Sequence, residues 1–291
     1  MTMEVVAVVV TNNRPIELKL VVEALRVQTF PVSKILIIDN ASQLPATEVL
    51  LGFDYVDVIR SEINTGGAGG FALALQSALL QPCDWVWMMD DDAVPRPDAL
   101  AQLVAAAVTL PKQAGALCSS VYEFGALATT HRRSYDKWLG WESPLPVQAY
   151  ANQSVPIDTG SFVGFMVRAQ AAQDVGLPNA EFFLAYDDTE YSLRLQKNGW
   201  SIYLVPASGI DHLRTEASKL STSAFGAKHF YNIRNRIYVA RRYSRLGVLA
   251  AVVKGGAVLL VARSPLNLKA FRLFLRAVVD GYHGRLGRLD S

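Results

Sequence analysis

Short apolar runs alternate with longer amphipathic stretches through the first 110 residues of the chain. The apolar runs are five or six residues long and mostly rich in Val and Ile, which is typical of strands buried on both faces. The stretches between them carry apolar residues at helical spacing. This alternation predicts an open, mostly parallel α/β sheet covered by helices. We expect strands over 5–10, 34–38, 56–60 and 84–89, and helices over 16–27, 69–80 and 97–110.

Charge is distributed unevenly along the chain. From Ala227 onward there are thirteen Lys or Arg and two acidic residues, a formal charge of +11, whereas the remaining fifteen basic and twenty-four acidic residues leave −9. Leu, Val and Phe are interleaved with basic residues over 263–276, which is typical of a helix lying on an anionic membrane surface. No nucleic-acid recognition motif accompanies this charge, so nucleic acid is not an expected partner. We predict two domains, a sheet domain over 1–225 and a basic, amphipathic helical extension over 226–291.

Nothing in the chain predicts a spanning segment or a leader. The apolar stretch 246–262 is interrupted by Lys254 and two glycines and is shorter than the roughly 20 residues that a spanning helix needs. The N-terminus lacks the basic start of a signal peptide. The two cysteines, Cys83 and Cys118, adjoin apolar stretches, so free thiols in a reducing cytoplasm are expected. Together these features predict a cytoplasmic protein that is peripheral on the inner face of the cell membrane.

Three consecutive carboxylates, Asp90, Asp91 and Asp92, follow the apolar run 84–89. A polar turn would explain one of them, but like charges this close repel each other and a turn does not need them. Carboxylates at the end of a buried strand supply hard oxygen ligands for a divalent cation that holds a phosphate. The run therefore predicts a cation site for nucleotide-diphosphate chemistry.

Polar residues also follow the first two predicted strands. Thr11 and Arg14 come after the first strand, and Asp39 ends the second, where it can accept hydrogen bonds from a base or ribose. The glycine-rich segment 64–71, which includes Asn64 and Gly67, opens a predicted helix. Glycines let the backbone approach a ligand, and helix N-terminal amides favour anionic oxygens. Plain turns remain the alternative at each of these places.

A second acidic group, Asp187, Asp188 and Glu190, precedes another predicted helix. Helix capping with dipole compensation would explain such acids. Two adjacent carboxylates also raise the pKa of one of them, which suits a general base. His212 follows the strand-like run 201–205; a lone histidine there is structural unless carboxylate ligands are at hand.

Taken in chain order, these motifs resemble the inverting family 2 glycosyltransferases, whose catalytic domain has the GT-A fold, and in particular the bacterial galactofuranosyltransferases. The resemblance spans roughly residues 5 to 240. It rests on Thr11 with Arg14 and Pro15, on the glycine-rich run 64–73, on Trp85 and Trp87 with the three aspartates, and on the segment 231–239.

The resemblance implies a donor site. Asp90 and Asp92 would hold Mg2+ or Mn2+ on the donor diphosphate, with His212 as a third ligand. The other nucleotide-sugar contacts that it implies are Thr11, Arg14, Asp39, Asn64, Gly67 and Asp91.

It also implies an acceptor site with a general base. Asp188 would be the base, with Asp187 and Glu190 placing acceptor hydroxyls. Many relatives have Glu-Asp or Asp-Glu at this pair, so Asp187 remains the other candidate base. Trp200 would contact the acceptor. Arg234 and Arg236 would bind it too, because guanidinium groups match the phosphate oxygens of a polyprenyl pyrophosphate; a basic helix that packs on the catalytic domain is the alternative for these two arginines.

The activity so implied is metal-dependent, inverting transfer of galactofuranose from UDP-galactofuranose to a polyprenyl-pyrophosphate-linked or oligosaccharide acceptor of a growing cell-surface glycan. Transfer of rhamnose from dTDP-rhamnose is the nearest alternative. A sugar-phosphate nucleotidyltransferase would be expected to carry a basic glycine-rich loop early in the chain, whereas 11–15 has one Arg and no Gly. A non-catalytic glycan-binding module would have no need of a base.

Overall fold

The central strands are buried on both faces because helices cover the sheet on each side. The computed structural model describes residues 3–214, 225–261 and 268–289. The first four strands are β1 (Val5–Thr11), β2 (Lys34–Asp39), β3 (Val56–Arg60) and β4 (Trp85–Asp90). They pair in parallel in the order β4-β1-β2-β3. The predicted strands are confirmed to within one residue at each end.

The other half of the sheet is mixed, with one antiparallel strand inserted between the two parallel groups. Its strands are β5 (Ala93–Pro95), β6 (Ala114–Glu123), β7 (Ala126–Leu127), β10 (Val155–Ile157), β12 (Phe165–Arg168) and β13 (Ser201–His212). The full order is β10-β13-β6-β12-β4-β1-β2-β3, with β5 paired to β13 and β7 to β6. β13 runs parallel to β6, and β12 runs antiparallel to both of its neighbours.

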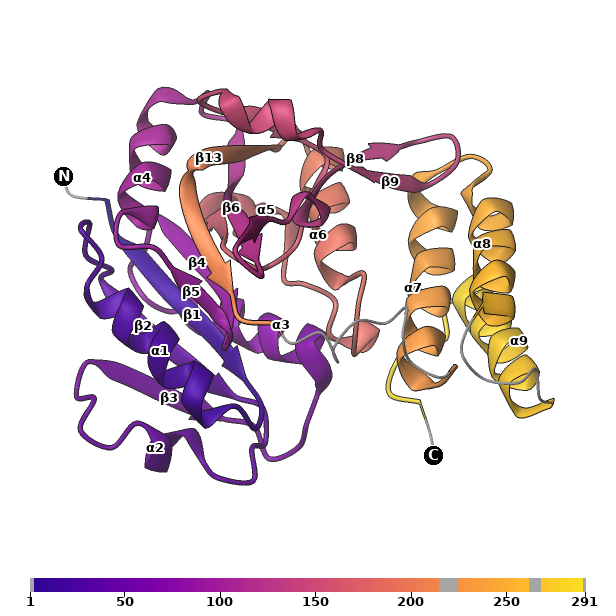
Figure 1. The fold of residues 1–291 in the computed structure, drawn as a ribbon, viewed down its shortest axis with the longest axis horizontal. Helices are drawn as coiled ribbons and strands as arrows, with labels where there is room; N and C mark the ends of the chain where they lie inside the picture. Colours follow the sequence, from indigo (N-terminus) through magenta and orange to yellow (C-terminus); the bar gives the residue numbers. More distant parts are fainter. Residues whose placement is uncertain (1–2, 215–224, 262–267, 290–291) are drawn as a thin grey trace.

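Successive residues of the central strands point to opposite faces of the sheet and pack in two separate hydrophobic cores. The helices of this part are α1 (Pro15–Arg26), α2 (Ala46–Val49), α3 (Gly66–Ala78), α4 (Ala99–Thr109), α5 (Ala169–Val175) and α6 (Asp187–Lys197). α1, α2 and α4 pack on one face and α3, α5 and α6 on the other, as the layers in Figure 1 show. The prediction of a helix-covered, mostly parallel sheet is confirmed.

A small second sheet links this layered part to a group of three helices. It consists of β8 (Arg132–Asp136), β9 (Trp141–Pro144) and β11 (Thr159–Gly160), and the helices are α7 (Ala227–Tyr243), α8 (Gly247–Val261) and α9 (Leu268–His283). Three short 3-10 helices are η1 (Thr129–His131), η2 (Val147–Ala151) and η3 (Ala180–Phe182). The β8–β9 hairpin reaches out toward α7 and α8 (Figure 1). Its turn is fastened to the start of α8, because the amide of Leu246 donates to the carbonyl of Trp138 over 2.7 Å.

The predicted helical extension is present, and α7 anchors it. Its three helices share a core of their own. Asn235 of α7 donates to the carbonyls of Leu184 and Ala185, just before α6, over 2.8 and 2.9 Å. In the described ranges, no helix combines the length and the apolarity needed to cross a membrane. Residues 262–267 of the predicted amphipathic segment lie outside those ranges.

Candidate active site

Sheet pairing brings together, at one edge, three side chains that could ligate a metal ion. Asp90 ends β4, and His212 ends β13 opposite Ala93 of β5. Nε2 of His212 therefore lies 3.1 Å from Oδ1 of Asp92. One ligand atom from each of Asp90, Asp92 and His212 lies within 4.8 Å of the others. We call these three residues the acidic edge.

The electrostatics of the acidic edge fit a divalent cation. Burial, together with the charge of Asp92, raises the pKa of Asp90 to about 7. Burial also raises the pKa of Asp91 to about 6. Burial alone would raise the pKa of Asp92, but His212 and Arg14 outweigh it and lower that pKa. Crowded carboxylates beside an imidazole form a donor set that Mg2+ or Mn2+ accepts, and a cation would relieve their repulsion.

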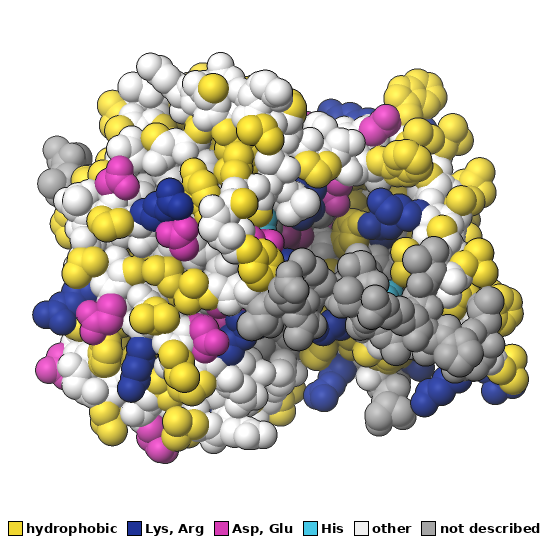
Figure 2. Space-filling view, in the orientation of Figure 1, with side chains coloured by type: hydrophobic (Ala, Val, Ile, Leu, Met, Phe, Trp, Pro, Cys, Tyr) yellow, Lys and Arg dark blue, Asp and Glu magenta, His cyan; other side chains and the backbone are white. Residues whose placement is uncertain are grey.

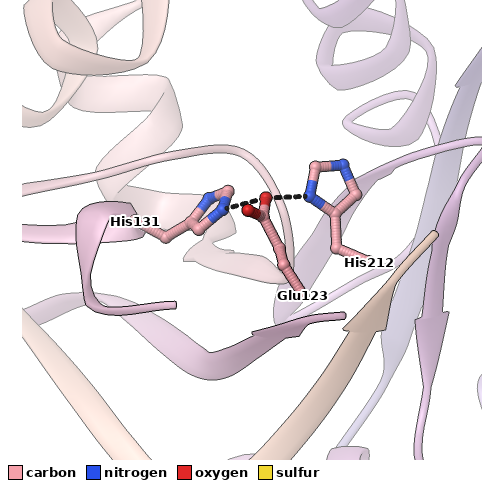
Figure 3. A group of neighbouring side chains, drawn as sticks. All are labelled: Glu123, His131 and His212. Carbon is pink, nitrogen blue, oxygen red and sulfur yellow. Dashed lines mark hydrogen bonds and ion pairs between the residues drawn. The ribbon is translucent and has the colours of Figure 1, made fainter. Parts of the chain in front are cut away.

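A partly buried chain of hydrogen bonds orients His212 (Figure 3). Oε1 of Glu123, near the end of β6, lies 2.9 Å from Nδ1 of His212 and 3.0 Å from Nε2 of His131. The hydrogen bond from His131 is the main cause that lowers the pKa of Glu123 to about 2. An ionised carboxylate only accepts, so both facing ring nitrogens carry protons and Nε2 of His212 is directed to the acidic edge. Glu123 and His131 were not predicted from the sequence.

The loop after β1 lies against the same aspartates. Oγ1 of Thr11 and the amide of Asn12 donate to Oδ2 of Asp91 over 2.8 and 3.1 Å. Arg14 forms an ion pair with Asp92, and its Nε lies 3.9 Å from Oδ1 of Asp91. The structure thus gathers the residues predicted at the ends of the first and fourth strands.

Asp39 is fully buried and holds the next loop in shape. Its carboxylate accepts hydrogen bonds from the amides of Ser42 and Ala46 over 2.8 and 3.0 Å and pairs with Arg60. Burial opposes these contacts, but they outweigh it and lower the pKa of Asp39. The loop that it shapes lines a crevice of about 210 Å3 together with Thr11. Direct contact of the Asp39 carboxylate with a nucleoside stays a prediction.

The glycine-rich segment has two distinct positions. Gly66 has φ +74°, and a Cβ there would lie 1.9 Å from the carbonyl oxygen of Phe183, so only glycine fits. The side chain of Asn64 accepts a hydrogen bond from the Gly66 amide over 2.8 Å. Gly67, in contrast, borders open space at the start of α3, since a Cβ there would meet no atom within 4 Å. The Cα of Gly67 therefore faces open space, and contact of its backbone with a ligand stays a prediction.

The two aspartates at the start of α6 have different surroundings. Asp187 is buried, and burial, Asp188 and Asp90 raise its pKa to about 8. Asp188 lines a pocket of about 360 Å3. Burial raises the pKa of Asp188, while the charge of Arg133 opposes the rise. The charge of Asp90 at the acidic edge thus acts on Asp187, whereas Asp188 lines the pocket.

We call this cavity the Asp188 pocket. Its walls come from the β8–β9 hairpin, the start of α6, and helices α7 and α8, and its other charged residues are Arg133, Glu142, Arg236 and Lys254. Arg236 was predicted as an acceptor contact. Lys254 carries one sequence signal, since it is the lone charge in the apolar stretch 246–262. Arg133 and Glu142 have no such signal.

Three predicted site residues lie elsewhere. The Glu190 carboxylate binds Arg194 and Tyr243, each over 2.9 Å, and so ties α6 to α7. Arg234 is 2% exposed and donates to backbone carbonyls, including that of Phe182 over 2.9 Å. Trp200 precedes β13, at the end of that strand opposite His212. None of the three lines the Asp188 pocket.

Comparison with known proteins defines the class. Residues 6–176 match the model of glycosyl transferase family 2, and the chain belongs to this family. It is similar to galactofuranosyltransferase GlfT1 of Mycobacterium tuberculosis strain H37Rv, with 32% identity over 256 residues that cover 82% of this chain and 83% of that protein. It is also similar to GlfT1 of Mycolicibacterium smegmatis, with 28% identity over 250 residues, or 81% and 82% of the two chains. The protein is a glycosyltransferase.

Solved structures confirm the fold. The crystal structure of GalNAc-T7 with UDP, GalNAc and Mn2+ matches with a TM-score of 0.64 at 16% identity, covering 82% of this chain and 48% of that one. The crystal structure of S. aureus TarS 1–349 matches with a TM-score of 0.56 at 13% identity, covering 97% and 72%. The expected GT-A fold is therefore confirmed.

Proposed function

We propose that this glycosyltransferase moves galactofuranose from UDP-galactofuranose, with inversion, to a lipid-linked or oligosaccharide acceptor of a growing cell-surface glycan. One observation carries the proposal: a general-base candidate, Asp188, lines a pocket, while its neighbour Asp187 lies within the electrostatic influence of the acidic edge. The similarity to galactofuranosyltransferases of two mycobacteria supports the choice of donor.

The donor would bind across the ends of β1, β2 and β4. Asp90, Asp92 and His212 would hold Mg2+ or Mn2+, which supplies positive charge for the departing diphosphate. Thr11 and Arg14 would contact the nucleotide beside Asp91, which already bonds the β1 loop. Asn64 and Gly67 would present the start of α3 to the anionic part of the donor.

The acceptor would enter the Asp188 pocket. The Asp188 carboxylate takes the proton of the acceptor hydroxyl while that oxygen forms a bond to the anomeric carbon. The bond from the anomeric carbon to the diphosphate oxygen breaks on the opposite face, and its electron pair leaves with UDP. Attack from the opposite face inverts the anomeric configuration. We assign the base to Asp188 rather than Asp187 because Asp188 lines the pocket.

The helical extension supports a peripheral place on the inner, cytoplasmic face of the membrane. α8 exposes Leu249, Val253 and Leu260, and α9 exposes Phe271 and Leu275, each set at helical spacing. These stripes are additional to the faces that pack in the shared core. Figure 2 shows hydrophobic side chains along this edge of the molecule, with Lys and Arg among them. A basic surface with apolar stripes suits an anionic lipid interface. We accordingly assign the donor site and the base to residues 1–225, and membrane association together with the α7 and α8 walls of the Asp188 pocket to residues 226–291.

Nucleotide release distinguishes the donors. UDP-galactofuranose, UDP-galactopyranose, UDP-glucose and dTDP-rhamnose are each incubated with the full chain, a lipid-linked acceptor extract, and either Mn2+ or EDTA. Release of UDP from UDP-galactofuranose alone, abolished by EDTA, is the expected result. Release from dTDP-rhamnose would instead assign the rhamnosyltransferase alternative, and release that persists in EDTA would contradict the cation site.

A further inference from the structure

The Asp188 pocket holds more positive charge than its carboxylates neutralise. Nη1 of Arg133 lies 2.8 Å from Oε1 of Glu142, so these two residues form a pair. Asp188 is the other carboxylate in the pocket lining. Arg236 and Lys254 remain, and in the part of the chain that the structure describes no ion pair joins either of them to a carboxylate.

The two remaining cations influence each other across the pocket. Arg236 lies on α7 and Lys254 on α8, and both side chains line the cavity. Nε of Arg236 donates to Oη of Tyr186, which fixes the guanidinium beside the start of α6. The charge of Arg236, followed by burial, lowers the pKa of Lys254 and outweighs the opposing charge of Glu142. Two like charges held this way are unfavourable until an anion lies between them.

We propose that Arg236 and Lys254 bind the phosphate of a phosphate-linked acceptor while Asp188 faces the sugar hydroxyl. This inference rests on the proposed function and adds Lys254 to the residues that bind the acceptor. A guanidinium and an ammonium are the side chains that proteins use for phosphate oxygens. The neutral Tyr186 leaves the charge of Arg236 available to that ligand.

The mouth of the pocket suits a lipid chain attached to that phosphate. Trp141 lines the pocket and is 50% exposed, and Val253, next to Lys254, is 65% exposed. Trp138 is 57% exposed and lies under the guanidinium of Arg245, 4.3 Å from its ring centre. An apolar surface thus adjoins the phosphate site on the side of α8, where the exposed stripes would meet a membrane. The acceptor would reach Asp188 without its lipid leaving the bilayer surface.

A binding experiment tests the site without requiring transfer. Farnesyl diphosphate is titrated into the full chain by calorimetry in the presence of EDTA, so that no cation holds a diphosphate at the acidic edge. We expect Lys254→Met to weaken binding by about tenfold or more, because a charged hydrogen bond is lost. Lys269→Met is the matched control, since it removes the same charge from an exposed position on α9 outside the pocket. Equal affinities of Lys254→Met and wild type, or no binding by wild type, would overturn the proposal.

Two further experiments complete the test. Vesicle binding distinguishes a lipid headgroup from an acceptor as the source of the phosphate, and transfer assays distinguish failure of this inference from failure of the proposed function. Vesicles of phosphatidylglycerol should bind the Lys254→Met and Lys269→Met variants equally; a selective loss with Lys254→Met would make the site one for lipid headgroups and overturn the acceptor assignment. In transfer assays, Lys254→Met should raise KM for a prenyl-pyrophosphate-linked acceptor and leave KM for a neutral alkyl glycoside unchanged. Transfer that proceeds with equal KM changes for both acceptors would overturn this inference alone. Selective farnesyl diphosphate binding without UDP release from any donor would contradict the proposed function and retain the site.

Discussion

The Glu123 carboxylate lies 2.9 Å from Nδ1 of His212, the ring whose other nitrogen lies 3.1 Å from Asp92. This contact fixes the tautomer of a metal-ligand candidate and raises its basicity. We predict that Glu123→Gln weakens Mn2+ binding by about 10- to 100-fold. Electron paramagnetic resonance of free Mn2+ during a titration measures this affinity. Glu62→Gln, at an exposed position, is the control and should bind like wild type. Wild-type affinity in Glu123→Gln would show that the contact does not support a metal ligand.

The neighbours Asp187 and Asp188 should differ in effect when each is replaced. Asp188→Asn removes the proposed base and should lower kcat by about 10²- to 10⁴-fold. Metal-dependent binding of UDP should persist, because the base acts on the acceptor rather than on the donor. Steady-state kinetics and calorimetry with UDP measure the two quantities. A larger loss of kcat in Asp187→Asn would assign the base to Asp187. A loss of UDP affinity in Asp188→Asn would contradict the role of Asp188 as a base that acts on the acceptor.

The pH at which kcat/KM falls on the acid side of the profile should depend on the charged residues of the Asp188 pocket. Burial raises the pKa of Asp188, Arg133 lowers it and Glu142 raises it. A base must be ionised, so activity should fall as pH decreases, starting at a higher pH than for an exposed aspartate. Glu142→Gln removes a negative charge and should move the acid limb to lower pH, whereas Arg133→Gln should move it to higher pH. kcat/KM is measured against pH with a neutral alkyl glycoside as acceptor. Shifts of the two variants in the same direction would contradict the assignment.

The exposed stripes of α8 and α9 should govern vesicle binding. Replacing Leu249, Val253 and Leu275 together by serine should reduce co-sedimentation with anionic vesicles, because apolar area is lost at the interface. Truncation after Tyr243 is a poorer test, because α8 and α9 complete the core that α7 shares. The control replaces three comparably or more exposed residues of the sheet domain, Leu51, Leu80 and Val108, by serine. Equal losses in both triple variants would show that these stripes are not the anchor.

The sequence was sufficient for the parts of the site that arise from local pattern. β1, β2 and β4 are apolar runs bounded by polar residues, and parallel strands must bring their ends to one edge. Thr11 and Asp91 therefore meet although 80 residues separate them. Glu123 could not be found in this way. Its contact with His212 depends on the parallel pairing of β6 and β13, while the separate pairing of β13 with β5 brings the same histidine beside Asp92.

Helix geometry and strand length explain why Arg234 and Trp200, which were predicted at the site, lie elsewhere. Arg234 and Arg236 are two positions apart on α7, so their side chains point to opposite faces. Arg234 faces the carbonyls before α6, while Arg236 faces the pocket. Trp200 stands before a strand that the sequence predicts only to residue 205, whereas β13 continues to His212. That length carries His212 to the acidic edge and leaves Trp200 at the other end.

The product formed from UDP-galactofuranose gives the most direct test of the central claim. The full chain is incubated with Mn2+, this donor and a neutral alkyl glycoside acceptor, and the anomeric configuration of the transferred sugar is read by nuclear magnetic resonance. The account predicts a galactofuranosyl product with a configuration opposite to that of the donor, and no product with Asp188→Asn. A product with the donor's configuration, or one formed equally well by Asp188→Asn, would contradict direct displacement with Asp188 as the base.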